Sequence, residues 1–135
     1  MVKRPHLINF GSVGTSEIGF LSVAQEYDKI PFQIKRVYWT YYTPQKVIRG
    51  GHANIAKELV LIAVAGSINV QIETLNGNIS DFKLDDPTIG LYIPKLCWHL
   101  MEYSHNAVQL VIASNDYSEA DYIRNYNEFK IYNNL

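Results

Sequence analysis

The strongest constraint on the fold is a series of short runs of β-branched and aromatic residues, each closed by a turn signal. Such runs predict strands, and almost no helical period is present before the C-terminal segment. The predicted strands cover residues 32–42, 50–54, 58–64, 68–75, 79–84, 89–93 and 107–114. Asn76-Gly77, the dipeptide most typical of a tight hairpin, separates two of them. The sequence therefore predicts an all-β protein.

One departure from this pattern is expected at the C-terminal end. Ser118 is followed by Glu119 and Asp121 in the manner of a helix start, and residues 122–132 are predicted to form a short helix. A chain of 135 residues is long enough for one domain and too short for two. We therefore expect a single domain at residues 1–135, with any site built inside one core.

Charge and cysteine content argue against several classes of protein. A formal net charge of −1 provides no basic stripe to neutralise a nucleic-acid backbone, so no nucleic-acid partner is expected. No apolar segment of signal-peptide length follows the N-terminus, and residues 59–65 are too few to span a bilayer, so no membrane association is expected. Cys97 is the single cysteine, which excludes an intramolecular disulfide and favours a reducing, cytoplasmic location.

Polar residues gather on one predicted strand, at Arg49, His52 and Asn54. In an extended strand His52 and Asn54 point to the same side, so an imidazole and an amide can face one bound substrate. Histidine is the usual general base near neutrality, and an arginine at the strand entry can hold a phosphate or a developing oxyanion. The plainer alternative is that His52 only satisfies a backbone carbonyl in the core. Its clustering with Arg49, Asn54 and Tyr38 favours a functional site.

Many short strands together with a second histidine late in the chain favour a small barrel, and the cupin jelly roll is the leading architecture. Cupins place a His-x-His pair, a glutamate six residues after the first histidine, and another histidine on a later strand. The corresponding positions here are His52, Asn54, Glu58 and His99. A neutral amide such as that of Asn54 is a poor ligand for a divalent transition metal, so no metal or other cofactor is expected.

Four segments carry a more specific resemblance. They are IPFQIKRVY at residues 30–38, RGGHA at 49–53, GLYIP at 90–94 followed by Trp98-His99, and ASNDY at 113–117 followed by DYIR at 121–124. In order and spacing these segments resemble the bacterial dTDP-4-keto-6-deoxyglucose 3,4-ketoisomerases. The resemblance runs from about residue 8 to residue 132, nearly the whole chain.

This resemblance implies a cupin homodimer without a metal, commonly with exchanged N-terminal strands, that acts on a dTDP-linked 4-keto-6-deoxy sugar. Members of the family move the keto group from C4 to C3 through an enediol, in the synthesis of deoxyamino sugars for surface glycans such as lipopolysaccharide. By similarity, His52 is the base that takes the C3 proton and returns it at C4. Tyr38 matches an active-site tyrosine, and Arg49 matches the arginine that opens the motif. Both are expected to stabilise the enediolate.

Asn54 departs from the family pattern, in which a histidine at this position is expected to help move a proton between the two sugar oxygens. One hypothesis is that Asn54 orients the enediol while water or Tyr38 relays the proton. The rival hypotheses are slower turnover, a different sugar, or a nucleotide-sugar-binding protein without isomerase activity. A 3,5-epimerase is disfavoured because the motif order is not that of the epimerases.

The remaining candidates for substrate binding are Arg36, Glu58, Trp98, Ile18 and His99. Arg36 shares a strand face with Tyr38 and can hold the diphosphate, and Trp98 can stack on the thymine if it is not simply a packing residue. Glu58 is more often a hydrogen-bonded interior carboxylate than a second general acid. Ile18 and His99 look like the positions that set the configuration at C4. His99 favours the galacto product, although Ile18 lacks the polar partner usually found there.

Overall fold

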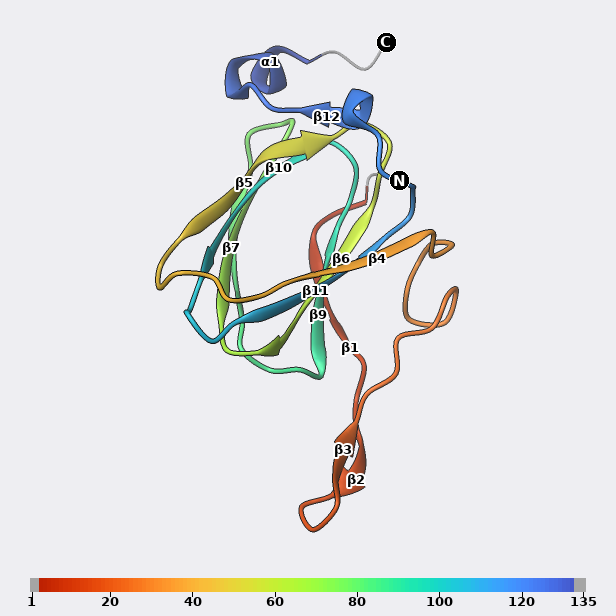
Figure 1. Ribbon diagram of the computed structural model, residues 1–135. Helices are drawn as coiled ribbons and strands as arrows, with labels where there is room; N and C mark the ends of the chain where they lie inside the picture. The colour runs from red at the N-terminus through yellow and green to blue at the C-terminus, as the bar shows by residue number, and fades with distance from the viewer. Residues whose placement is uncertain (1–2, 133–135) are drawn as a thin grey trace.

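The computed structural model describes residues 3–132, whose main strands form two five-stranded sheets packed face to face (Figure 1). The first sheet has the order β1 (His6–Asn9), β9 (Ile89–Ile93), β6 (Leu59–Ala65), β11 (Val108–Ala113) and β4 (Arg36–Thr40). The second has the order β12 (Tyr122–Ile123), β5 (Ile48–Asn54), β10 (Cys97–Tyr103), β7 (Ile68–Thr74) and β8 (Ile79–Leu84). Strand pairing in both sheets is antiparallel. The predicted all-β, jelly-roll class is confirmed.

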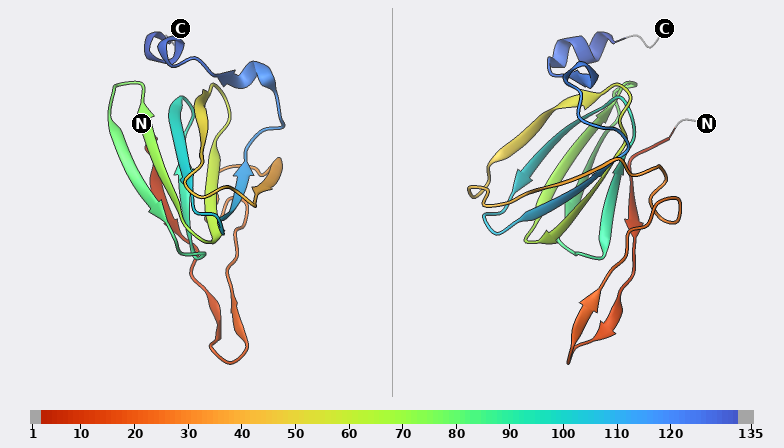
Figure 2. Two further views of the ribbon diagram at one scale, coloured as in Figure 1. Left: turned by 60° about the vertical axis from the view of Figure 1, so that its left-hand side comes forward. Right: turned by 45° about the vertical axis from the view of Figure 1, so that its right-hand side comes forward.

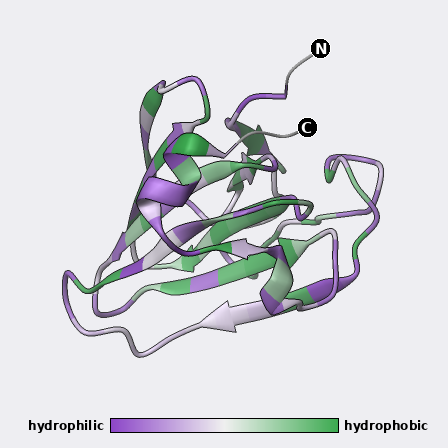
Figure 3. Ribbon diagram, turned by 90° about the horizontal axis from the view of Figure 1, so that it is seen from above, coloured by the Kyte–Doolittle hydropathy of each residue, from purple (hydrophilic) through white to green (hydrophobic). Residues whose placement is uncertain are grey.

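Strand β6 shows how the core is built, because both of its faces are covered. Leu59 and Leu61 point between the sheets into the main apolar core, whereas Val60 and Ile62 belong to a second cluster on the outer face. That outer face is covered by the N-terminal part of the chain, including the buried Phe32. A continuous apolar run is typical of a strand buried on both faces. In Figure 3 the apolar stretches lie along the strands, and many of the connecting loops are hydrophilic.

The Asn76-Gly77 turn joins β7 and β8 in the predicted hairpin. Gly77 has a φ of +89°, and its N–H donates to the carbonyl of Thr74 at 2.9 Å. The strand predicted at residues 32–42 is shorter in the structure, because only Arg36–Thr40 pairs with β11. Strand β10 continues to Tyr103, beyond the Trp98-His99 segment noted in the sequence.

A second hairpin stands apart from the barrel. Strands β2 (Val13–Thr15) and β3 (Gly19–Leu21) pair with each other in a separate two-stranded sheet, and Figures 1 and 2 show this hairpin projecting away from the body of the molecule. Its large apolar side chains are exposed; they include those of Val13, Ile18, Phe20 and Leu21. Strand patterning did not reveal these elements, since each has only three residues and contains or adjoins a glycine.

The C-terminal segment differs from the helix predicted at residues 122–132. A 3₁₀ turn, Glu119–Asp121, is followed by β12, and the helix α1 begins only at Tyr126 and ends at Ile131. Residues 122–123 are not helical because their backbone pairs with the edge of β5. Asn125 caps α1 by accepting a hydrogen bond from Glu128 N at 3.0 Å. The short C-terminal helix is therefore confirmed, and its predicted start is wrong.

Helix α1 is attached to the outer face of the second sheet. Tyr126 Oη and Lys130 Nζ donate to the carboxylate of Glu73 on β7, at 2.7 Å and 2.6 Å. Phe129 is fully buried and packs near Trp98, with the ring centroids 5.7 Å apart. Within residues 3–132, no helix is long and apolar enough to cross a membrane.

Candidate active site

A cavity of about 400 Å³ draws its walls from both sheets. It is lined by Arg36, Tyr38, Thr40, Arg49, Gly50, His52, Met101, Tyr103, Gln109, Tyr122 and Arg124. Three of these side chains are arginines, and none of the lining residues is an aspartate or a glutamate. An imidazole and three phenols stand among the guanidinium groups. A cavity with this lining suits an anionic ligand.

The double glycine of β5 explains how Arg49 and His52 reach the same cavity. Residues three apart on a regular strand point to opposite faces. Here Gly50 lies opposite Leu100 while His52 lies opposite His99, so the register shifts by one residue at a β-bulge. Gly50 has a φ of +91°, and a Cβ at this position would lie 2.7 Å from the carbonyl oxygen of His99. The bulge needs glycine there, and it turns both functional side chains inward.

His52 lies in a pocket of aromatic rings. Its ring centroid is 4.5 Å from that of His99 and 4.8 Å from that of Tyr122. Burial, together with the neighbouring His99, Arg124 and Lys57, lowers the pKa of His52 to about 3. The imidazole is therefore neutral at physiological pH, the protonation state that a general base requires.

Tyr38 and Arg36 face the cavity from β4. The Arg36 guanidinium lies 4.5 Å from the centre of the Tyr38 ring. Its Nη1 atom is buried and has no hydrogen-bond partner among the described residues. Burial raises the pKa of Tyr38, and the nearby Tyr122 raises it further. Tyr38 is therefore a hydrogen-bond donor at neutral pH, and Arg36 has an unused N–H group for a ligand.

Asn54 is placed differently from His52, although both are on β5. Its side chain is buried at 3% exposure and does not line the cavity. The Asn54 amide donates to Asp121 Oδ2 at 3.2 Å, and the other oxygen of Asp121 accepts from the backbone N–H of Ala56 at 2.6 Å. These bonds connect the end of β5 to the 3₁₀ turn that precedes β12.

His99 and Glu58 also lie outside the cavity lining. His99 is buried directly behind His52, and its Nδ1 bonds to the carbonyl of Cys97 at 3.1 Å. Glu58 accepts hydrogen bonds from Tyr92 Oη and from Lys3 Nζ. Burial opposes ionisation of Glu58, but these bonds outweigh it and hold the pKa of the carboxyl below its usual value. This is the arrangement of a hydrogen-bonded interior carboxylate.

Two further sequence candidates do not line the cavity. Trp98 points to the opposite face of β10 and packs against Tyr126 and Phe129 of α1, at centroid distances of 5.3 Å and 5.7 Å. Ile18 lies in the turn of the projecting hairpin and is 84% exposed. The structure thus brings together four of the nine candidates as lining residues: Arg36, Tyr38, Arg49 and His52.

Several cavity residues were missed by the sequence reasoning. Tyr122 and Arg124 fell in a predicted helix, so nothing placed them opposite β5. Gln109 is buried within an apolar strand and accepts a hydrogen bond from Tyr103 Oη at 2.7 Å. A polar residue inside an apolar run was an available signal for Gln109. The alternation along β4 would have added Thr40.

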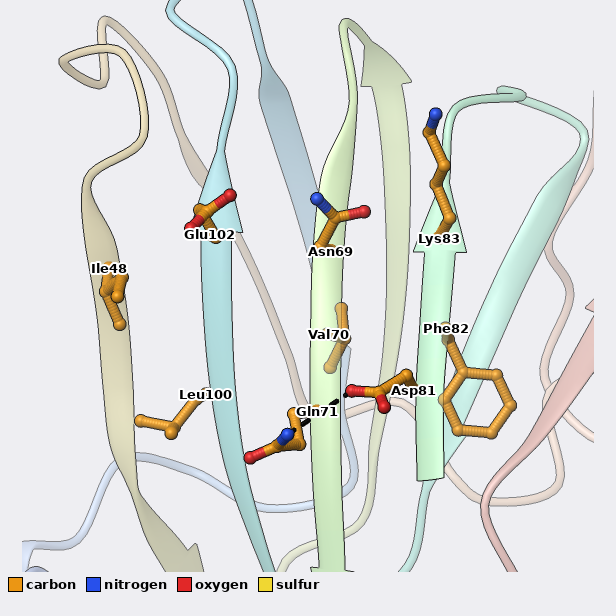
Figure 4. Close-up of a pocket in the computed structure, with 9 residues that line it drawn as sticks. All are labelled: Ile48, Asn69, Val70, Gln71, Asp81, Phe82, Lys83, Leu100 and Glu102. Atoms are coloured by element: carbon orange, nitrogen blue, oxygen red, sulfur yellow. Dashed lines mark hydrogen bonds between the residues drawn. The ribbon is translucent and has the colours of Figure 1, made fainter. Parts of the chain in front are cut away.

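A larger hollow of about 500 Å³ lies on the other face of the second sheet (Figure 4). Its walls come from β5, β10, β7 and β8, and they include Gln71 and Asp81, which are joined by a hydrogen bond of 3.4 Å. None of the sequence candidates lines it, and it contains no histidine. The smaller cavity is therefore the candidate active site. Within residues 3–132, no group of three or more His, Cys, Asp or Glu side chains is arranged to hold a metal ion.

Comparison with known proteins gives consistent matches over nearly the whole chain. The family described as "FdtA: WxcM-like, C-terminal" matches residues 3–134. The protein named TDP-4-oxo-6-deoxy-alpha-D-glucose-3,4-oxoisomerase from Aneurinibacillus thermoaerophilus is 41% identical over 128 residues, which are 93% of this chain and 90% of that protein.

Two solved structures show the same fold. A sugar 3,4-ketoisomerase from Thermoanaerobacterium thermosaccharolyticum, in complex with TDP, has a TM-score of 0.89 at 34% identity, covering 96% of this chain and 94% of that chain. A TDP-quinovose 3,4-ketoisomerase from Campylobacter jejuni has a TM-score of 0.88 at 37% identity, covering 96% of this chain and 98% of that chain.

Proposed function

This chain belongs to the WxcM-like, C-terminal family, and from that premise we propose that it is a sugar 3,4-ketoisomerase acting on TDP-4-keto-6-deoxyglucose. The product is a TDP-3-keto-6-deoxyhexose. The observation that carries the proposal is the cavity in which the neutral imidazole of His52 meets phenols and arginines, with no carboxylate among the lining residues. Nucleotide sugars are cytoplasmic metabolites, so we place the reaction in the cytoplasm.

His52 is the proposed base. A proton at C3 is weakly acidic because it is next to the C4 ketone, and a neutral imidazole can take it while the electrons move onto O4. The same imidazole, now protonated, returns a proton at C4 to complete the isomerisation. Burial beside His99 and the cations favours the neutral ring, so the proton is readily given back.

Cationic and phenolic groups stabilise the charge that develops during this transfer. Arg49 and Tyr38 are proposed to donate hydrogen bonds to the enediolate oxygens. Arg36 and Arg49 have no carboxylate within ion-pair distance among the described residues, whereas Arg124 is paired with Glu119 at 2.7 Å. The free Nη1 of Arg36 is therefore the best-placed donor for the diphosphate.

Asn54 leaves an alternative function open. An amide cannot titrate, and this one is already bonded to Asp121. The alternative is a nucleotide-sugar-binding protein without turnover, or one with a different sugar. The isomerase is favoured because the proposed base, His52, and the charge-stabilising residues are present together in the cavity.

We assign the galacto configuration at C4 to the product on the basis of His99. This residue lies directly behind the base, where it can influence which face of the enediol receives the proton. The similarity to a TDP-quinovose isomerase supports the gluco product instead, since quinovose is the gluco isomer. The coupling constants of the product sugar ring distinguish the two: a galacto product has an axial C4 hydroxyl and a gluco product an equatorial one.

A homodimer with exchanged hairpins is also part of the proposal. The β2–β3 hairpin exposes four large apolar side chains and pairs with no strand of its own barrel. A second copy can cover these side chains, and the exchange can bring Ile18 to the partner's active site. Exposed apolar surface of this kind is typical of a protein–protein contact.

Proton NMR of the purified protein with TDP-4-keto-6-deoxyglucose in deuterated water tests the function. We expect the 3-keto sugar to appear with deuterium at C4 and the remaining 4-keto sugar to gain deuterium at C3, and the His52→Asn variant to lose both signals. Binding of the sugar nucleotide without exchange would identify the alternative, a protein that keeps the fold without the chemistry.

A further inference from the structure

Lys57 is a buried lysine that has no carboxylate partner in the part of the chain that the structure describes. It lies in the loop between β5 and β6, is 1% exposed, and donates a hydrogen bond from Nζ to Tyr122 Oη at 3.1 Å. Among residues 3–132, no aspartate or glutamate oxygen lies within ion-pair distance of Nζ. An ammonium group that is buried without an anion is unfavourable for folding. The cost of burying this ammonium group beside a phenol therefore indicates a functional role for it.

Tyr122 lies at the cavity beside the proposed base. Its backbone pairs with that of Asn54 at the edge of β5, which sets the ring next to His52 at a centroid distance of 4.8 Å. The guanidinium of Arg124 lies 4.3 Å from the centre of the same ring. The neighbours of Tyr122 thus include His52, Lys57 and Arg124, and its ring lines the cavity.

Ketone migration needs a second proton movement. Besides the transfer from C3 to C4, the hydroxyl proton on O3 must reach O4, because the ketone and hydroxyl exchange places. Asn54 cannot take part as an acid or base, and its amide is bonded to Asp121. Tyr38 and Tyr103 are the other phenols that line the cavity, but burial raises the pKa of both, so each is a better hydrogen-bond donor to an oxyanion than a group that passes protons on.

Resting on the proposed isomerase function, we propose that Tyr122 relays the proton from O3 to O4, and that Lys57 is the positioning residue that orients its hydroxyl. After His52 has taken the C3 proton, the O3–H bond breaks and its proton moves to a lone pair of Tyr122 Oη. The phenolic O–H bond breaks at the same time, and that proton moves to O4. The negative charge passes from O4 to O3, and Tyr122 is regenerated without any further reactant.

The hydrogen bond from Lys57 suits this exchange. It occupies one lone pair of Tyr122 Oη, which leaves the other for the O3 proton and the phenolic hydrogen for O4. A cationic donor also stabilises the partial negative charge that develops on Oη if its own proton leaves first.

The Tyr122→Phe variant separates the two proton movements in the deuterated-water experiment. We expect deuterium exchange at C3 to continue, since His52 is intact, while formation of the 3-keto sugar falls by about 10²-fold or more. The matched control is Tyr41→Phe, which removes a hydroxyl from an exposed side chain and should leave both signals unchanged.

Two variants of Lys57 test its positioning role. Lys57→Met keeps an unbranched side chain but removes the donor, so it should retain C3 exchange and lose product formation. Lys57→Arg restores a cationic donor and should recover part of the product rate. A merely structural role would lower exchange and product together, and thermal denaturation identifies any variant that fails to fold.

The outcomes are distinguishable from failure of the proposed function. If the wild-type protein gives neither exchange nor product, the isomerase proposal falls, and the relay falls with it. If the wild-type protein is active and Tyr122→Phe forms product at the same rate, only the relay is overturned. Loss of C3 exchange together with product in Tyr122→Phe would also overturn the relay, because it would place Tyr122 at the first proton transfer.

Discussion

His52 and His99 stand directly opposite each other in the β5–β10 pair, with their ring centroids 4.5 Å apart and their planes at 71°. Nδ1 of His99 lies 3.1 Å from the carbonyl of Cys97, which can only accept, so this nitrogen carries the hydrogen. Burial lowers the pKa of both imidazoles, and His99 lowers that of His52 further. The site therefore holds two neutral rings, and protonation of one disfavours protonation of the other.

The pH dependence of catalysis should reflect this pair. The free enzyme keeps His52 neutral well below the ordinary histidine pKa, so kcat/KM should stay level from about pH 8 down to about pH 5. Initial rates measured across this range, with folding checked at each pH, test the prediction. An acid limb centred near pH 6.5 would contradict it.

Folding stability should fall on acidification for the same reason. The pKa of each histidine is lower in the folded state than in the unfolded chain, so below about pH 6.5 the unfolded state binds more protons. Each buried histidine should then reduce the free energy of unfolding by up to about 1.4 kcal/mol per pH unit. Urea denaturation at two pH values measures the slope, and His52→Gln should reduce it. An unchanged slope in that variant would refute the assignment to His52.

Replacing Gly50 by alanine should damage both stability and activity. The new Cβ would lie 2.7 Å from a backbone oxygen at a φ of +91°. We expect the free energy of unfolding to fall by about 1–3 kcal/mol or more. Activity should also fall strongly, because the bulge directs the side chains of Arg49 and His52 into the cavity. Gly77→Ala is the matched control: its φ is +89°, but nothing lies within 4 Å of the added Cβ. Equal changes in melting temperature for the two variants would argue against the close contact at Gly50.

Replacing Asn54 by histidine tests whether the amide is an adapted part of the site. The side chain is 3% exposed and donates to Asp121, so the larger ring should cost about 1–3 kcal/mol and lower the isomerisation rate. Asp121→Asn, which alters the same contact from its other end, is the companion variant. A faster Asn54→His enzyme would show instead that this chain is an impaired relative of the His-Ala-His pattern.

The exposed hairpin predicts the assembly state. Phe20 is 66% exposed on β3, and a charge there should convert the proposed dimer to a monomer in the Phe20→Asp variant. Ile131→Asp, at an 80% exposed position of α1, should remain dimeric. Light scattering coupled to gel filtration gives both masses. A wild-type protein that is monomeric at high concentration would remove the basis for hairpin exchange.

Alternation, turn residues and apolar runs were enough to predict most of the barrel. The hairpin at Asn76-Gly77 and the doubly buried β6 depend on local signals that the sequence displays directly. The C-terminal segment was harder, because Tyr122 and Ile123 are strand residues only through pairing with β5. Strand pairing between distant segments is a tertiary effect, and it overrode the local tendency toward a helix.

The site, like the fold, could be predicted where it depends on local sequence and not where it depends on contacts between distant segments. Arg49 and His52 were identified because they gather on one predicted strand, Tyr38 because it matches a tyrosine of the similar family, and Arg36 because it shares a strand face with Tyr38. The sequence could not show that Asn54 is bonded to Asp121, or that Lys57 reaches Tyr122, since each contact joins positions more than sixty residues apart. Ile18 remains a prediction, because only a second copy of the chain can bring it near a cavity.

The extra residue at the Gly50-Gly51 bulge changes which residues of β5 face the cavity, from odd-numbered to even-numbered positions. Before it, the inward-facing position that lines the cavity is odd-numbered, at Arg49; after it, the corresponding position is even-numbered, at His52. Deleting or inserting one residue between them would send one of the two functional groups to the opposite face, even if every other letter of the motif were kept. The site is thus specified by how many residues the motif contains as well as by their identity, and transplanting it to another barrel would require the irregularity to be moved with it.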